Sequence, residues 1–264
     1  LLPIVLGAIY LGHWWFFGLL AFGGYLMVAE WLAMHGQKGT LLALICTLLC
    51  SIIPIIFLLD LNTIVKTSHI LICSLVCAAI ILLIVSPARL ASARSRDAGF
   101  SILPIMSGVA YVGMALISLM WLRGLDHNGK IVIWLFFAVW AMDVGGYFAG
   151  KGIGGPKLAP KLSPKKTWAG LIGGMVLAAI ISAIISQLSD IQTPLLLAIA
   201  GAVIAVIAQA GDLYESSIKR HMNIKDSGAL IPGHGGILDR VDGLIFAAPF
   251  AAVIIVVNSM TNAG

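Results

Sequence analysis

Chemically active side chains are concentrated in residues 225–242, which read KDSGALIPGHGGILDRVD. The segment holds three aspartates, a lysine, an arginine and a histidine, together with four glycines and a proline. Glycines let backbone N–H groups approach an anion closely, and the proline fixes the entry of the loop. Carboxylate oxygens are the ligands that Mg²⁺ prefers. The combination indicates a site that handles a phosphate group and a divalent cation.

Polar residues also follow the apolar run AVIAVIAQAG directly, in the segment GDLYESSIKR. Four of them would share one face if the run continues as a helix: Asp212, Glu215, Ser216 and Lys219. Asp212 should lie at the membrane boundary, where a carboxylate is costly unless a cation or base compensates it. The alternative is a solvated helix end. We interpret Asp212 as a functional carboxylate.

Asp239 and Asp242 are three residues apart at the start of the last apolar run. Acids also suit helix N-termini because of capping and the helix dipole, so a structural role is the alternative for Asp242. We interpret Asp239, with Arg240 beside it, as facing Asp212 across a divalent cation. His234 could orient a phosphate or hold the loop through hydrogen bonds, and a lone histidine supports either reading.

The segment 151–167, KGIGGPKLAPKLSPKKT, carries five lysines and no acid. Its prolines stiffen it into a basic strip suited to a polyphosphate, although anionic lipid headgroups would also bind there. Asp143 lies roughly 12 Å inside the end of the preceding apolar run, at 1.5 Å per helical residue. An ionisable group at that depth is a functional candidate, and a buried protonated aspartate is the alternative.

Membrane helices must position these residues. The chain has 264 residues, of which 60% are hydrophobic and 10% charged, with a mean hydropathy of +1.05, outside the range of soluble domains. We expect an all-α polytopic membrane protein with about nine transmembrane helices and its active site at the cytoplasmic face. The opening LLPIVLGAIYLG is expected to belong to a first membrane helix whose start has been trimmed, not to a signal peptide. The predicted spans are 1–12, 14–33, 40–59, 69–86, 101–122, 131–150, 168–186, 194–211 and 244–260.

Positive charge is distributed unevenly between the two sides of this arrangement. Thirteen of the 16 lysines and arginines follow the even-numbered spans, whereas Lys66, Arg123 and Lys130 lie on the other side. By the positive-inside rule, the rich side is cytoplasmic. That rule does not explain the five acids in 212–243, which therefore point to a site.

The four cysteines form two pairs at i, i+4 within apolar runs, Cys46 with Cys50 and Cys73 with Cys77. No histidine or acid lies within five residues of Cys46 or Cys50. We expect these cysteines to pack in the membrane and not to bind a metal or form a disulfide.

The run SIKRHMNIKDSGALIPGHGGILDRVD at 217–242 resembles the signature of phosphatidate cytidylyltransferases, also called CDP-diacylglycerol synthases. KLSPKKTWAG at 161–170 and GDLYES at 211–216 look like the same family. The resemblance covers most of 140–250. It implies that CTP and phosphatidic acid give CDP-diacylglycerol and pyrophosphate at an Mg²⁺-dependent site, with a second cation possible. It also implies a homodimer in the bacterial inner membrane.

The resemblance assigns roles residue by residue. Asp212 and Asp239 would be the leading metal ligands, with Asp143 and Asp242 as supporting carboxylates. Lys225, His234 and Arg240 would close the catalytic site. The CTP phosphates would be bound by four residues of the basic segment: Ser163, Lys165, Lys166 and Thr167. Lys219 and Arg220, at the bilayer surface, would hold the phosphatidate headgroup, and the remaining substrate-binding positions would be Ser217, Gly235 and Gly236.

We therefore expect residues 1–100 to be a scaffold of transmembrane helices, with possible dimer contacts. Residues 101–264 would form the catalytic region, with cytoplasmic loops at 151–167 and 212–243. The expected partners are CTP, phosphatidic acid, the lipid bilayer and a second copy of the chain, and no nucleic acid.

Rival functions make different predictions. A lipid-alcohol kinase that uses CTP as a phosphoryl donor would release CDP instead of pyrophosphate. CDP-alcohol phosphotransferases carry an Asp-rich signature that is absent from this sequence. A secondary transporter would place charges near the midplane of two symmetric halves, whereas most acids here cluster toward one face. A membrane scaffold would explain neither the acids nor the glycines.

Overall fold

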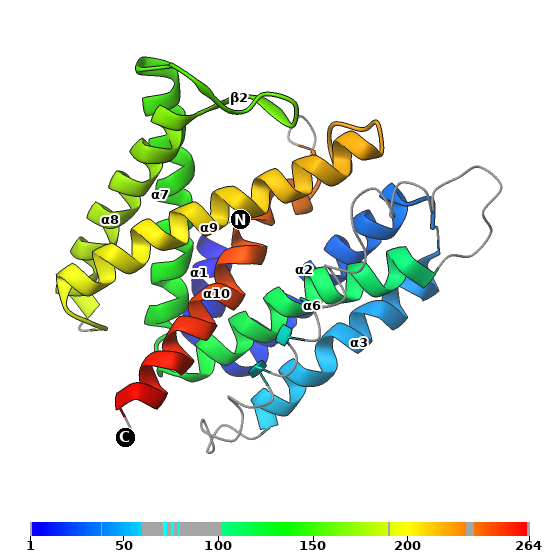
Figure 1. The fold of residues 1–264 in the computed structure, drawn as a ribbon. Coiled ribbons are helices and arrows are strands. Elements are labelled where there is room, and N and C mark those ends of the chain that lie inside the picture. Colours follow the sequence, from blue (N-terminus) through cyan, green and yellow to red (C-terminus); the bar gives the residue numbers. More distant parts are fainter. Residues whose placement is uncertain are drawn as a thin grey trace.

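The computed structural model describes residues 2–37, 39–59, 71, 72, 75, 76, 79, 102–189, 191–230 and 235–262. Most of these residues are helical (Figure 1). The helices are α1 (Leu2–Leu11), α2 (His13–Met34), α3 (Thr40–Leu59), α6 (Ile102–Gly124), α7 (Lys130–Gly152), α8 (Trp168–Ser189), α9 (Pro194–His221) and α10 (Leu238–Asn262). Between α7 and α8, the strands β1 (Lys157–Ala159) and β2 (Ser163–Thr167) form an antiparallel hairpin.

Six of the described helices are long and apolar enough to cross a membrane: α2, α6, α7, α8, α9 and α10. The prediction of a helical, polytopic membrane protein is therefore confirmed. The predicted span at 1–12 corresponds to α1, whose 10 residues reach about 15 Å, half of the hydrocarbon thickness. The predicted span at 69–86 lies outside the described residues, apart from isolated positions.

The two helices that carry the acidic residues are longer than predicted. Helix α9 continues to His221 instead of ending near 211, and α10 begins at Leu238 instead of 244. Hydropathy falls in these turns, but several of their charged side chains pair within α9 or between α9 and α10. In α9, Lys219 pairs with Glu215 one turn earlier. The last turn of α9 consists of basic residues, and positive charge there interacts favourably with the negative end of the helix dipole.

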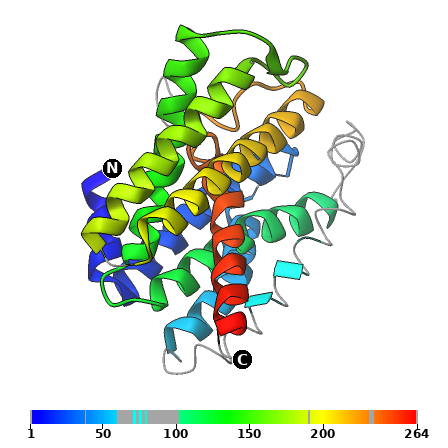
Figure 2. The ribbon, with the colours of Figure 1, turned by 60° about the vertical axis from the view of Figure 1, so that its left-hand side comes forward.

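Helix α6 is the centre of the bundle. In the most apolar 18-residue stretch of α6, 72% of the residues are buried, whereas the corresponding figure for α8 is 28%. The high burial of α6 arises because it packs against α2, α3, α7 and α10. Figures 1 and 2 show α9 and α10 on one side of it and α3 on another. Cys46 and Cys50 are buried free thiols in α3, as predicted for the first pair; Cys73 and Cys77 lie outside the described residues.

Helices α7 and α8 approach each other through glycines. A Cβ atom on Gly145 would lie 2.6 Å from the carbonyl oxygen of Gly173, and one on Gly174 would lie 2.8 Å from that of Met142. Small residues at such contacts let membrane helices pack backbone against backbone. This close pair sets Asp143 of α7 beside β2, which leads directly into α8.

Arg123 ties the short helix α1 to the bundle at the end of α6. This arginine is buried, and its guanidinium donates hydrogen bonds to the carbonyl oxygens of Ile9 (2.6 Å), Asp126 (2.8 Å), His127 (3.0 Å) and Tyr10 (3.2 Å). The carbonyls of Ile9 and Tyr10 lie in the last turn of α1, where helical carbonyls have no partner within the helix. The Arg123 side chain therefore supplies hydrogen-bond donors to carbonyl groups of two backbone segments, the end of α1 and the turn after α6.

Replacing Arg123 with methionine is expected to lower the melting temperature in detergent. Hydrogen bonds from a charged donor each contribute about 1.5–3 kcal/mol, and their loss would leave buried carbonyl groups without a partner. Arg123→Lys should lose less, because it keeps the charge but not the forked geometry. Thermal unfolding measures both variants, and an unchanged melting temperature in Arg123→Met would contradict this assignment.

Candidate active site

A cavity of about 190 Å³ opens where α7, β2, the start of α8 and α9 meet. Its polar lining comes from three elements that are far apart in sequence: Asp143 and Tyr147; Lys165, Lys166 and Thr167; Gln209 and Asp212. The hairpin places its lysines over the cavity because β2 runs straight into α8, and Thr167 accepts a hydrogen bond from the N–H of Gly170 (3.0 Å) in the first turn of α8. The cavity thus combines two carboxylates with two ammonium groups.

Lys166 and Asp212 form an ion pair at this cavity. Their side chains are 21% and 24% exposed, so both charges are largely removed from water while still reachable from the cavity. The second oxygen of Asp212 accepts a hydrogen bond from Ser216 (3.3 Å) one turn further along α9. The predicted sharing of one helix face by Asp212, Glu215, Ser216 and Lys219 follows from the extension of α9.

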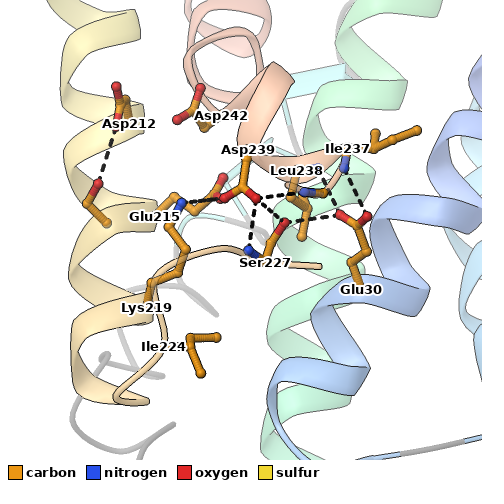
Figure 3. Close-up of polar contacts among 12 residues, drawn as sticks. Glu30, Asp212, Glu215, Lys219, Ile224, Ser227, Ile237, Leu238, Asp239 and Asp242 are labelled. Atoms are coloured by element: carbon orange, nitrogen blue, oxygen red, sulfur yellow. Dashed lines mark hydrogen bonds and ion pairs between the residues drawn. The ribbon is translucent and has the colours of Figure 1, made fainter. Parts of the chain in front are cut away.

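Asp239 lies at the start of α10, deeper than Asp212 and surrounded by donors (Figure 3). One of its oxygens accepts from Lys219 Nζ (2.5 Å). The other accepts from the N–H and hydroxyl of Ser227 (2.9 and 3.0 Å) and from the N–H of Gly236 (2.8 Å). These bonds hold the carboxylate in one orientation and attach it to the loop before α10.

Lys219 joins α9 to α10 by bridging two acids. Its ammonium also contacts Glu215 at 3.0 Å, and both the lysine and Glu215 are buried. From the sequence, Lys219 was expected at the bilayer surface. In the structure its side chain points inward, because its two acidic partners, Glu215 of α9 and Asp239 of α10, lie between the two helices. Arg220 stays exposed and donates to the carbonyl oxygens of Leu162 and Ile224, both at 3.3 Å.

The acids along α9 and α10 outnumber the lysines that pair with them. Asp212 and Glu215 are one turn apart on α9, and Asp239 and Asp242 are one turn apart on α10 (Figure 3). The two helices approach closely there, since a Cβ atom on Gly211 would lie 2.8 Å from the carbonyl oxygen of Asp242. Four basic side chains lie near these four acids and Asp143: Lys166 and Lys219, which pair with them, Lys165 at the cavity, and Arg240, whose charge acts on Asp143.

The surplus of carboxylates suits a cation. Glu215 has one buried oxygen with no hydrogen-bond partner among the described residues, and burial of a polar atom without a partner is costly even though its other oxygen pairs with Lys219. Within the same described residues, no three histidine, cysteine or acidic side chains are gathered so that they could hold a metal ion by themselves. A cation bound here would therefore need oxygens from a ligand as well as from the protein.

The remaining predicted positions are scattered around this centre. Ser163 pairs with Ala159 at the far end of the hairpin, Ser217 is half-buried on α9, and Lys225 and Arg240 are exposed. Gly235 has a positive φ of 82°, which favours glycine, and the N–H of Gly236 is directed at Asp239. His234 lies outside the described residues.

Glu30 of α2 is a polar residue of this region that the sequence reasoning missed. Its carboxylate accepts hydrogen bonds from the N–H groups of Ile237 and Leu238, both at 2.9 Å, and from the hydroxyl of Ser227 at 3.1 Å (Figure 3). The signal was present, because an acid within an apolar span is a functional candidate by default. Its partner could not be found from sequence, since about two hundred residues separate the two.

Comparison with known proteins gives a consistent result. The profile of the cytidylyltransferase family matches residues 1–258. The chain is similar to the phosphatidate cytidylyltransferase of Brucella suis, with 36% identity over 143 residues that make up 54% of this chain and 53% of that protein. It is also similar to the enzymes of the same name from Bacillus subtilis (36% over 144 residues, 53% of each chain) and Staphylococcus epidermidis (31% over 162 residues, 61% and 60%). The matched part spans somewhat more than half the length of these relatives.

Proposed function

Because the chain belongs to the cytidylyltransferase family, we propose that it transfers the cytidylyl group of CTP to phosphatidic acid. The products are CDP-diacylglycerol and pyrophosphate, and the activity serves phospholipid biosynthesis. The observation that carries the proposal is the cavity where the Lys166–Asp212 pair meets Asp143, next to the Asp239–Lys219–Glu215 network. Nucleotidyl transfer needs that combination, because its main task is to position and neutralise phosphate groups.

In the proposed step, a phosphate oxygen of phosphatidic acid attacks the α-phosphorus of CTP. A new P–O bond forms there as the bond from the α-phosphorus to the oxygen that bridges to the β-phosphorus breaks, and pyrophosphate leaves with that oxygen. The attacking phosphate is largely ionised at neutral pH, so a strong general base is not required. Lys165 and Lys166 would bind the triphosphate, with Ser163 and Thr167 of the same hairpin, and would offset the repulsion between the two anions.

We assign Mg²⁺ to Asp212 and Asp239, with Asp143 and Asp242 as supporting carboxylates. Bound there, the ion would neutralise charge on the triphosphate. The surplus of acids supports this assignment, and the two phosphate substrates are the source of the further oxygens that the site requires. Lys219, held between Glu215 and Asp239, would keep these two acids in place. Arg220, Ser217, Lys225, His234, Arg240, Gly235 and Gly236 would complete the substrate site.

We also propose the finer topology. The chain would cross the bacterial inner membrane nine times, with the cavity facing the cytoplasm and residues 1–100 acting as a scaffold for residues 101–264. The support is the excess of lysine and arginine in the loops on the side of the cavity. A homodimer is part of the same proposal, and the mass of the purified protein in detergent would test it.

The test of function is direct. Purified protein is incubated with Mg²⁺ and CTP labelled in either the α- or the γ-phosphate, together with phosphatidic acid or, in a parallel reaction, with diacylglycerol, the alcohol that a lipid kinase would phosphorylate. The proposal expects label from the α-position in the lipid and γ-label in pyrophosphate. Release of CDP with γ-label in the lipid would instead identify a CTP-dependent lipid kinase, and unchanged CTP would contradict both.

A further inference from the structure

We propose that Glu30 of α2 is a positioning residue, which fixes Ser227 and the first turn of α10, where Asp239 lies. This inference rests on the proposed function. Glu30 takes no place in the cavity itself. Its three hydrogen bonds instead reach the backbone at the first turn of α10 and the side chain of Ser227. It links the N-terminal helices to the segment that matches the family signature.

The bonds of Glu30 and Asp239 share one partner. The hydroxyl of Ser227 lies within reach of both, 3.1 Å from Glu30 and 3.0 Å from Asp239, and donates its one hydrogen to one of them at a time, while the N–H of Ser227 donates to Asp239 (2.9 Å). The two carboxylates therefore hold Ser227 and the residues at the start of α10 (Figure 3). A shift of Ser227 or of the start of α10 would move Asp239 with it.

The loop is shaped to admit the Glu30 carboxylate. A Cβ atom on Gly228 would lie 2.9 Å from one oxygen of Glu30, and a Cβ atom on Gly236 would collide with the other oxygen and with the Ser227 hydroxyl. The glycines at these two positions thus leave room for the acid. From the sequence, the glycines of the signature were expected to let a phosphate approach the backbone. At Gly228 and Gly236 the space is instead occupied by the Glu30 side chain.

Ordinary helix capping is the rival explanation, since a carboxylate at a helix N-terminus stabilises it. The chain offers a matched case. Asp126 accepts hydrogen bonds from the N–H groups of Asn128 (3.0 Å), Lys130 (2.8 Å) and Ile131 (3.2 Å), at the start of α7 and far from the cavity. If Glu30 only caps a helix, removing either carboxylate should have the same kind of effect. If it positions Asp239, the effects should differ.

The experiment compares Glu30→Gln with Asp126→Asn in the purified protein. Glutamine keeps the size of Glu30 but replaces one acceptor with an NH₂ group that opposes a backbone donor. Geometry at a catalytic group must hold to about 0.5 Å, so we expect kcat to fall about tenfold or more in Glu30→Gln. Asp126→Asn should keep kcat within about twofold, even if its melting temperature falls as much as that of Glu30→Gln. Glu30→Asp, which retains the charge, should recover part of the rate.

Amide hydrogen exchange supplies a readout that does not depend on turnover. Glu30→Gln should speed exchange in peptides that contain Ser227, Ile237 and Leu238, and Asp126→Asn should do so only near the start of α7. A kcat within about twofold of the unmodified protein in Glu30→Gln would overturn the inference and leave the proposed function intact. If the unmodified protein makes no CDP-diacylglycerol, the proposed function fails. In that case the hydrogen-exchange measurement alone would test whether Glu30 holds the start of α10. Unaltered exchange near Ile237 in Glu30→Gln would reject that role.

Discussion

Asp239→Asn is expected to lower kcat by about a thousandfold or more while the protein still folds. Asparagine has the size of aspartate but no negative charge, so it would hold Lys219 and the proposed divalent cation less tightly than the carboxylate. Metal ions contribute several kcal/mol to charge stabilisation in such reactions, and about 1.4 kcal/mol corresponds to a factor of ten. Initial rates of CDP-diacylglycerol formation at saturating CTP and phosphatidic acid measure the loss.

Folding of Asp239→Asn must be measured separately, because four hydrogen bonds converge on this carboxylate. A monodisperse detergent complex and a melting temperature close to that of Asp126→Asn, which removes a carboxylate of similar bonding, would show that the loss is catalytic. Near-normal turnover in a folded Asp239→Asn would remove this residue from the metal site. It would leave Asp212 and Asp143 as the acids to examine next.

Lys166→Met is expected to lower kcat/KM for CTP by about a hundredfold. The ammonium of Lys166 is the cation that contacts Asp212 at the cavity, and loss of one such group that stabilises developing charge typically reduces the rate by about 10²–10³. Methionine keeps much of the side-chain length and apolar volume. Steady-state kinetics with varied CTP should show a raised KM together with a lowered kcat.

Lys161→Met is the matched control for this variant. Lys161 belongs to the same hairpin and is exposed, but it is not among the residues that line the cavity. Its replacement should leave kcat/KM within about twofold. Equal losses in Lys161→Met and Lys166→Met would mean that the hairpin acts through its total charge, for example by attracting anionic lipid, and not through one ammonium group.

The six described helices that are long enough to cross a membrane fall on predicted spans, because an apolar run of that length dominates the local signal. The ends of α9 and α10 were wrong by several residues. Hydropathy drops where Asp212, Glu215 and Lys219 begin, and a sequence cannot show that these charges pair with each other and with Asp239. The hairpin of 157–167 was also missed, since its prolines and lysines indicated only an extended basic segment.

The candidate site could be located from sequence but not assembled. The acids and the basic segment stood out against an apolar chain, and the structure brings Asp143, Lys166 and Asp212 to one cavity. Which lysine pairs with which acid depends on the packing of helices that are far apart in the chain. The inward turn of Lys219 is such a case, and so is the contact of Glu30 with α10.

The contact between Glu30 and the two glycines has a consequence for how sequences of this family can diverge. An alanine at position 228 would crowd the acid, and loss of the acid would open space there, whereas at position 236 the Ser227 hydroxyl would still block a Cβ atom. Natural variation at 30 and 228 should therefore be correlated. A search that scores the C-terminal signature alone would also accept chains in which residue 30 no longer fits against the glycines of the signature.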